Sequence, residues 1–303
     1  MIKSRTTLIL GAGASAPYGF PIGSALRDDL LKTDGIFNVK LKEASLDVKA
    51  WVEIQDLLHR YQSSSVDDFL RVYSEHADYM KIAIAFQLNR HERLKEHQNP
   101  NHSDPWYRVL LDEVLENDPK LGDGALSIVT FNYEMSLEHY LAGTLQVRHR
   151  LEEEEANEAL TALNFQHIYG AIGPALNGHH WSRPYGEFPS TRHLQTAANG
   201  ISTCFEPKSR EAVAVARKLI AESKNLLFLG FGYSAENLKR LDLLTCVQPH
   251  TNIVASQFQC HSGFERLRQA IGGVPVALRA VDDDGRHGTV AVNLTRLLFD
   301  GLK

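Results

Sequence analysis

The start of the chain combines a short apolar strand with a glycine-rich turn and a helix. Thr6–Leu10 is a run of apolar and β-branched residues, and Gly11-Ala12-Gly13-Ala14-Ser15 follows it directly. Gly19-Phe20-Pro21 and a helical pattern, Ser24–Leu31, come next. Small residues let a backbone approach a ligand closely, and the free N–H groups at a helix start favour an anion. This arrangement predicts a nucleotide site in the first quarter of the chain.

Short apolar segments with the residue types of buried strands recur along the chain. Helical patterns separate the later ones, at Glu206–Ser223, Ala235–Cys246 and Gly263–Ile271, and Thr289–Leu302 is also predicted to be helical. Continuous apolar strands that alternate with helices favour a parallel sheet covered by helices on both faces. We therefore expect an α/β, Rossmann-like fold with strands at Thr7–Leu10, Ala125–Thr130, Phe165–Ile168, Leu226–Leu229, Asn252–Ala255 and Val274–Ala280.

Residues 36–124 interrupt this alternation with a largely helical stretch. Asp47–Tyr61, Val66–His97 and Asp104–Leu115 carry apolar residues three and four positions apart, and Ser65 is a predicted N-cap. One strand-to-strand crossover does not need this much helix. We expect an inserted helical module at 36–124 and a Rossmann-like domain built from 1–35 and 125–303.

A second irregular stretch, Pro174–Gly200, is rich in Gly, Pro, His and Asn. Its composition predicts a loop or lid near the chemistry.

Composition excludes several classes of protein. The 303 residues carry a net charge of −5, so a broad nucleic-acid footprint is not expected. The acidic run Glu152–Glu155 is predicted to be a solvated helix start. Three cysteines, Cys204, Cys246 and Cys260, stand far apart, which argues against a zinc module or a disulfide framework. With no signal-peptide pattern and no apolar run near the roughly 20 residues of a membrane span, we expect a cytoplasmic protein without a membrane partner.

Two strand ends carry polar residues suited to chemistry. Asn132 follows the strand that ends at Thr130, and α/β sheets bind ligands at the carboxyl ends of their strands. Asn132 is therefore either a ligand-binding side chain or the N-cap of the next helix. His167 and Tyr169 lie on one face of a strand if its alternation continues. They are either a structural pair or groups that position or deprotonate a hydroxyl or water.

A second strand–glycine–helix junction occurs at Leu226–Ser234, with Asn237 in the helix that follows. Two such junctions in one sheet favour an extended ligand such as a dinucleotide. Gly11-x-Gly13-x-x-Ala16 matches a loose dinucleotide fingerprint. No second strand with a terminal acid follows it, however, and Asp28 and Asp29 fall within a helix. This absence argues against a standard NAD-dependent dehydrogenase.

Four ordered motifs over residues 6–260 resemble the sirtuin superfamily. Gly11–Ser15 with Gly19-Phe20-Pro21 resembles its opening GAG-x-S and G-I-P signature, and Thr130–Glu134 resembles its T-Q-N-I-D motif. His167-Ile168-Tyr169-Gly170 resembles its H-x-H-G strand end. Gly230–Ser234 resembles its later glycine–serine motif, which touches phosphate and ribose. The resemblance implies a fold and a site built around NAD.

The chain also departs from that family. Ile22-Gly23-Ser24 stands where D-F-R is expected, the four-cysteine zinc module is absent, and Tyr169 occupies the position of the catalytic histidine. These departures resemble the divergent bacterial sirtuin-like proteins of anti-phage defence, which hydrolyse NAD. The chain resembles their stand-alone members, which implies a homo-oligomer and a HerA-type ATPase partner.

The expected activity is therefore cleavage of the nicotinamide–ribose bond of NAD by water, with NAD as substrate and no metal. Asn132 would bind the ribose and orient the water, and His167 or Tyr169 would act as base; the near-neutral pKa of imidazole favours His167. The expected binding residues are Gly11, Ala12, Gly13, Ser15 and Pro21 on the first junction, and Gly230, Gly232, Ser234 and Asn237 on the second.

Two other functions remain open at this stage. The chain could be an NAD- or ADP-ribose-binding regulatory subunit of a defence complex, or a protein-lysine deacylase, which the absent zinc module disfavours. No paired-carboxylate motif indicates a nuclease.

Overall fold

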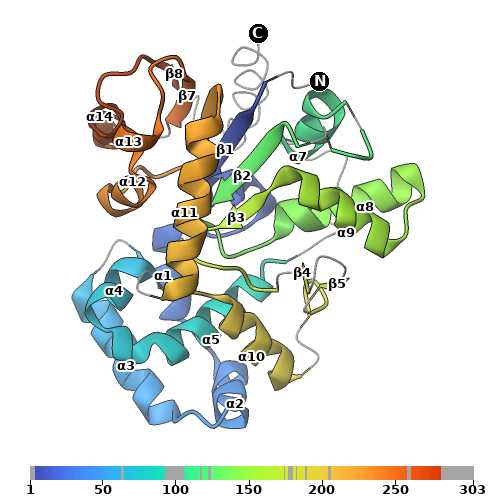
Figure 1. Cartoon of the computed structure of the whole chain (residues 1–303). Coiled ribbons are helices and arrows are strands. Elements are labelled where there is room, and N and C mark those ends of the chain that lie inside the picture. Colours follow the sequence, from blue (N-terminus) through green and yellow to red (C-terminus); the bar gives the residue numbers. More distant parts are fainter. Residues whose placement is uncertain are drawn as a thin grey trace.

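The structure is a computed structural model, which describes residues 4–62, 65–92, 106–116, 118–121, 124–173, 175–176, 180–181, 183–187, 190–203, 206–257 and 261–280. Within them, a parallel sheet of six strands forms the centre of the molecule (Figure 1). The strand bounds are β1 Thr6–Leu10, β2 Leu126–Thr130, β3 Phe165–His167, β6 Asn225–Leu229, β7 Asn252–Gln257 and β8 Val276–Ala280.

The strand order β3-β2-β1-β6-β7-β8 is the order 3-2-1-4-5-6 of a doubly wound Rossmann sheet. Every residue of β1, β2 and β6 is buried, as their continuous apolar runs predict. The expected α/β class and all six expected strands are thus confirmed.

The register aligns the carboxyl ends of the three central strands. Leu10, the last residue of β1, pairs with Thr130 of β2 on one side and with Leu229 of β6 on the other. The chain leaves β1 and β6 on the two sides of the topological switch point, where sheets of this kind bind ligands. Both glycine-rich junctions and Asn132 therefore lie at one edge of the sheet.

Helices make up most of the remaining structure. The chain contains α1 Gly23–Leu30, α2 Gly35–Glu43, α3 Val48–Tyr61, α4 Val66–Val72, α5 Ala77–Asn89, α7 Trp106–Val109, α8 Ser136–His149, α9 Glu153–Leu160, α10 Thr191–Gly200, α11 Pro207–Glu222, α12 Ala235–Leu241, α13 Leu243–Cys246 and α14 His261–Ala270. A π-helical turn, Leu110–Val114, extends α7, and 3-10 turns occupy Ala12–Ala14, Ala16–Tyr18, Ser74–His76 and Thr161–Leu163. The strands β4 Ala175–Leu176 and β5 His180–Trp181 pair as a separate antiparallel ribbon.

Helices α2, α3, α4, α5 and α10 gather in one group below the sheet in the view of Figure 1. Helix α5 packs against α1 and α10, which connects this group to the first junction. The helical character expected for the region after the first junction is confirmed over α2–α5. The expected continuous helix from Val66 is instead divided into α4 and α5 by the turn Ser74–His76. The division of the chain into an inserted module and a main domain stays a prediction.

The expectation of an irregular segment up to Gly200 is wrong in its last part, because Thr191–Gly200 forms α10. Leu194, Ala197 and Ala198 are buried at helical spacing, so packing outweighs the segment's Gly and Asn content. The acidic run behaves as predicted: Glu152 caps α9, and Glu153, Glu154 and Glu155 are exposed in its first turn. Ser65 caps α4 by accepting the Asp68 N–H at 3.2 Å. The helix predicted at Thr289–Leu302 lies outside the described residues.

Candidate functional site

The two glycine-rich junctions pack directly on each other. The Gly11 amide donates to the Leu229 carbonyl at 3.1 Å, and the Gly13 amide donates to the Gly230 carbonyl at 3.0 Å. A Cβ on Gly11 or Gly13 would lie 2.6 or 2.8 Å from the Gly230 carbonyl oxygen. These glycines are therefore required for the contact between the loops, and their amide hydrogens are already used within the protein.

A cavity of about 90 Å³ lies beside the first junction. Of the predicted binding residues, Ala12, Ser15 and Pro21 line it, and Gly23 at the start of α1 also borders it. No side chain caps the N-terminus of α1, so its first amides remain available to a ligand. The whole lining is Ala12, Ser15, Phe20, Pro21, Gly23, Leu26, Ser65, Val66, Asp67, Leu88, Phe131, Asn132, Tyr133 and Glu134.

Asn132 forms part of this cavity and is held from several sides. Its amide N–H donates to Thr130 Oγ1 at 3.0 Å, and its Nδ2 group donates to Ser15 Oγ at 3.3 Å and to Glu134 Oε1 at 3.0 Å. Its Oδ1 atom is buried and has no hydrogen-bond partner. Asn132 is not the cap of the next helix, because α8 begins at Ser136 with Met135 at its N-cap. A buried acceptor without a partner marks a place for a ligand or water.

Two carboxyl groups line the same cavity. Glu134 Oε2 accepts the Ser136 amide N–H at 2.7 Å, and burial raises the pKa of Glu134. Asp67, from the first turn of α4, accepts a hydrogen bond from the Tyr133 hydroxyl at 2.6 Å, and burial raises its pKa as well. The lining contains no Lys or Arg side chain. The cavity is thus suited to a neutral or cationic group.

His167 lies behind Asn132 and uses both of its ring nitrogens. Nδ1 is 2.9 Å from the Asn132 carbonyl oxygen, and Nε2 is 2.6 Å from Glu138 Oε1. Burial alone would lower the pKa of His167, but the Glu138 carboxylate outweighs it, so the pKa is raised above its usual value. His167 and Glu138 line a narrow space that shares Ser15, Asn132 and Glu134 with the main cavity.

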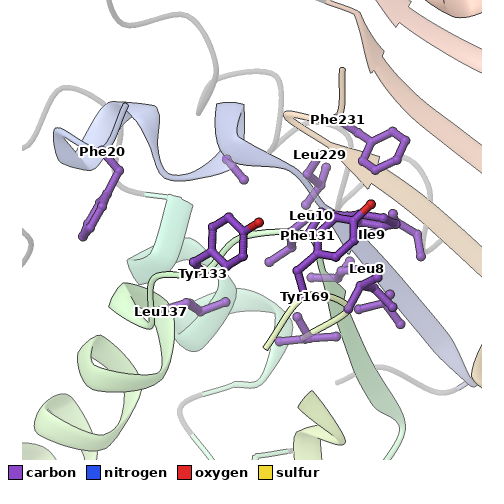
Figure 2. Close-up of a cluster of buried hydrophobic side chains, with 14 of the residues drawn as sticks. Leu8, Ile9, Leu10, Phe20, Phe131, Tyr133, Leu137, Tyr169, Leu229 and Phe231 are labelled. Carbon is purple, nitrogen blue, oxygen red and sulfur yellow. The ribbon is translucent and has the colours of Figure 1, made fainter. Parts of the chain in front are cut away.

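Tyr169 has a separate set of partners. Its hydroxyl donates to Asn237 Oδ1 at 2.8 Å, and the Arg240 guanidinium lies 5.4 Å from its ring centroid. Figure 2 places Phe131 beside Tyr169 at the end of β1, and their ring centroids are 5.8 Å apart. Because β3 ends at His167, strand alternation does not extend to Tyr169. His167 and Tyr169 were predicted to lie on one face of the strand, but their side chains contact different residues.

The second junction supplies the other predicted binding residues. The Gly230 amide donates to Ser256 Oγ at 3.0 Å, and Ser234 caps α12 by accepting the Asn237 N–H at 3.2 Å. A Cβ on Gly232 would meet no atom within 4 Å, and this glycine is exposed. Gly232 therefore leaves its backbone accessible to a ligand at this junction.

Three carboxyl residues of the site were not predicted as site residues: Asp67, Glu134 and Glu138. Asp67 stands in a helix start whose acids have an ordinary structural role, and Glu138 stands in the first turn of α8, where an acid is equally ordinary. Only the fold brings Asp67 to Tyr133 and Glu138 to His167. Their burial is the distinguishing signal, and a single sequence does not reveal it.

No group of three or more His, Cys, Asp or Glu side chains in the described part of the chain is arranged to hold a metal ion. Likewise, none of the helices described here is long and apolar enough to cross a membrane. No family model and no curated protein matches the chain.

Proposed function

We propose that the protein is an NAD glycohydrolase, which cleaves the nicotinamide–ribose bond and gives nicotinamide and ADP-ribose. The observation that carries this proposal is Asn132, whose buried Oδ1 has no partner and which borders a cavity at the switch point of a Rossmann-type sheet. Such a group can accept a hydrogen bond from a ribose hydroxyl or from water at the place where these sheets bind nucleotides.

The charges of the cavity favour the nicotinamide end of NAD. The oxidised nicotinamide ring is a cation, and Asp67 and Glu134 are the carboxyl side chains of the lining. Phe20 and Phe131 add aromatic surface. The cavity, at about 90 Å³, is smaller than an engineered cavity of about 150 Å³ that binds benzene, so the nicotinamide ring would enter it only after the lining side chains move apart.

The rest of the substrate would extend over the two junctions. We assign the phosphates to the N-terminus of α1 and to the turn formed by Gly11, Ala12, Gly13 and Ser15. In this turn, Gly11 and Gly13 supply close packing, because their amides bind the carbonyls of β6 and of Gly230. Gly230, Gly232, Ser234 and Asn237 would contact the adenosine side.

The reaction breaks the bond between C1′ of the ribose and the pyridinium nitrogen. The bonding electrons go to the ring, which leaves as neutral nicotinamide, so no acid needs to protonate it. The sugar develops oxocarbenium character, as in other glycosidic cleavages. Carboxyl groups near the site stabilise this positive charge when they are ionised. Water then bonds to C1′ and loses one proton.

Asn132 would orient the ribose and the water, and the sequence offers His167 and Tyr169 as acceptors of the proton. His167 is one hydrogen bond from Asn132, whereas the Tyr169 hydroxyl is bonded to Asn237. Both ring nitrogens of His167 have partners, so it can act as a base only if one contact opens.

The resemblance to sirtuin-like defence proteins supports a biological role for this reaction. Depletion of NAD would stop growth of a phage-infected cell. We propose that the chain forms homo-oligomers and is activated by an infection signal or by a HerA-type ATPase partner.

The test is incubation of the full chain with NAD, with and without a HerA-type ATPase, and quantification of nicotinamide and ADP-ribose. Asn132→Ala should abolish nicotinamide release, while Asn199→Ala, an exposed position on α10, should leave it unchanged. Circular dichroism would check that both variants fold. Normal release by Asn132→Ala would contradict the proposed site.

A binding module is the alternative. This alternative is favoured because the polar atoms of the His167 and Tyr169 side chains already have hydrogen-bond partners, so neither side chain is free to act as a base in this structure. Tight NAD binding without nicotinamide release, even with the ATPase present, would support this second function.

A further inference from the structure

We propose that Glu138 is a positioning residue, which holds His167 as a protonated ring so that the pair fixes Asn132 instead of accepting the proton of water. The effect of this pair on catalysis rests on the proposed NAD hydrolysis, whereas the protonation of His167 by itself is independent of that proposal. The proposal stands on the contacts of His167, which join the end of β3 to α8 and to the loop after β2.

The side chains of His167 and Glu138 are in direct contact and are largely shielded from solvent. His167 Nε2 and Glu138 Oε1 are 2.6 Å apart, and the side chains are only 11% and 6% exposed. An ion pair at the surface is screened by water and contributes little, but a buried pair of this geometry fixes both of its members. Glu138 therefore determines where the imidazole ring lies.

The second nitrogen identifies one proton on the ring. Nδ1 faces the Asn132 carbonyl oxygen at 2.9 Å, and a carbonyl can only accept a hydrogen bond. Nδ1 thus carries a hydrogen, which it donates to Asn132. The remaining proton lies between Nε2 and the Glu138 carboxylate, and it decides whether the pair is charged.

The surrounding charges favour a protonated ring. Glu138 from α8 and Glu134 from the loop after β2 both raise the pKa of His167 against the effect of burial. Tyr107 from α7 borders the same narrow space, and Tyr185 is affected by the charge of Glu138. The pKa of each of these two phenols is raised by burial, so both stay neutral near neutral pH.

The pair acts on Asn132 through its backbone. Thr130, Ser15 and Glu134 hold the amide N–H and the Nδ2 group of Asn132, and His167 holds its carbonyl oxygen. Oδ1 alone has no partner. Loss of the Nε2 proton would set the lone pair of Nε2 against the Glu138 carboxylate, and this repulsion would displace the ring together with the Asn132 carbonyl that Nδ1 holds, which would move Oδ1 relative to the substrate.

A positioning role and a base role predict opposite pH dependences. A base must be deprotonated, so activity would rise with pH through the titration of His167. A protonated positioning ring requires the reverse, with activity lost as pH rises through the same titration. The two roles can therefore be separated by a pH–rate profile combined with a direct measurement of the His167 protonation state.

The experiment compares the full-length protein with Glu138→Gln, which keeps the shape of the side chain and removes its charge. The control is Glu211→Gln, an exposed position on α11. Nitrogen-15 NMR of the histidine rings, assigned by the signal missing in His167→Gln, gives the protonation of His167 without any substrate. Nicotinamide release gives kcat and KM across the pH range.

We expect His167 to carry protons on both nitrogens at neutral pH, and Glu138→Gln to move its titration to lower pH. The pH at which kcat is lost on the alkaline side should shift together with this titration. At neutral pH, kcat should fall by up to about 100-fold, as it does when a reacting group is slightly misplaced. KM should change little. Glu211→Gln should match the unchanged protein in every measurement.

A ring that is neutral at neutral pH, or an activity that rises through its titration, would overturn the proposal. So would a Glu138→Gln variant with unchanged titration. If the unchanged protein releases no nicotinamide even with a HerA-type ATPase present, while His167 still titrates high and shifts in Glu138→Gln, the proposed NAD hydrolysis fails and the protonated pair remains.

Discussion

Arg183 and Glu92 form an ion pair that is closed to solvent, with side chains 2% and 0% exposed. Arg183 Nη1 donates to Glu92 Oε2 at 2.8 Å, and Arg183 Nε donates to the Ile172 carbonyl at 2.8 Å. Glu92 also accepts the Gly186 amide N–H at 2.8 Å. The pair thus attaches the chain after β5, and through Ile172 the segment after β3, to the residues just beyond α5.

Removing one partner of this ion pair should lower the stability of the fold. We expect Glu92→Gln to lower the free energy of unfolding by about 3–5 kcal/mol, because it leaves the Arg183 charge buried without its counter-charge. The exposed pair Arg60–Asp56, with side chains 67% and 62% exposed, is the matched control. Asp56→Asn should change the stability by less than about 1 kcal/mol. Urea unfolding measures both, and equal effects would contradict the assignment.

The contact between the glycine loops leads to a second prediction. Gly13→Ala should destabilise the fold by about 1–3 kcal/mol, because its Cβ would lie 2.8 Å from the Gly230 carbonyl oxygen and backbone cannot move away cheaply. Gly35→Ala is the control, since a Cβ there meets nothing within 4 Å. We expect that variant to be unchanged or stabilised by about 0.4–1 kcal/mol. Thermal unfolding of the two variants decides the point.

Gly232 allows folding and binding to be separated. Gly232→Ala should keep the melting temperature, because its Cβ would project into open space. If the adenosine side of NAD lies against this backbone, the same variant should weaken NAD binding about tenfold, which corresponds to about 1.4 kcal/mol. Isothermal titration measures the affinity. Unchanged affinity would remove Gly232 from the proposed binding residues.

Asp67 should decide which nicotinamide derivatives enter the cavity. An acidic lining disfavours an anionic ligand, so NAD should bind more tightly than nicotinic acid adenine dinucleotide, whose ring carries a carboxylate. Asp67→Asn should reduce this preference, and Asp68→Asn, on the same helix but absent from the lining, should preserve it. Competition binding with the two dinucleotides measures the ratio, and an identical ratio in both variants would argue against the assignment.

His167 should contribute to the pH dependence of stability. Its folded pKa is raised, so its stabilising contribution is fully present below the unfolded pKa of about 6.5 and is lost as pH rises through the folded pKa. The difference in unfolding free energy between the unchanged protein and His167→Gln should therefore decrease toward alkaline pH. Urea unfolding at a series of pH values checks the sign, and a difference that grows with pH would refute it.

The central strands β1, β2 and β6 were predictable because each is a short, mostly apolar run, and burial of every residue leaves few alternatives for such a sequence. Leu226–Leu229 and Ala125–Thr130 were located to within a residue for this reason. The placement of Asn132 follows from the same logic, since a residue just after a parallel strand must lie at the ligand-binding edge.

The contacts that surround the site residues were harder to predict from the sequence. Glu138 and His167 are separated by 29 positions, and Asp67 and Tyr133 by 66, so their contacts depend on helix packing that periodicity does not encode. The glycines of the first turn illustrate a different difficulty. Their small size was attributed to a ligand, whereas the structure shows that Gly230 also requires it.

The strand order has a consequence for how the chain acquires its fold during synthesis. Strand β1 lies between β2 and β6, and Leu10 pairs with Thr130 and Leu229. At about 5–20 residues per second, a ribosome needs roughly 10–40 s to add the residues from the end of β1 to the end of β6. Throughout that interval at least one edge of a segment that is fully buried in the native fold is unpaired. We therefore expect β1 to be a binding site for chaperones on the nascent chain, and expression without them to favour aggregation through this segment.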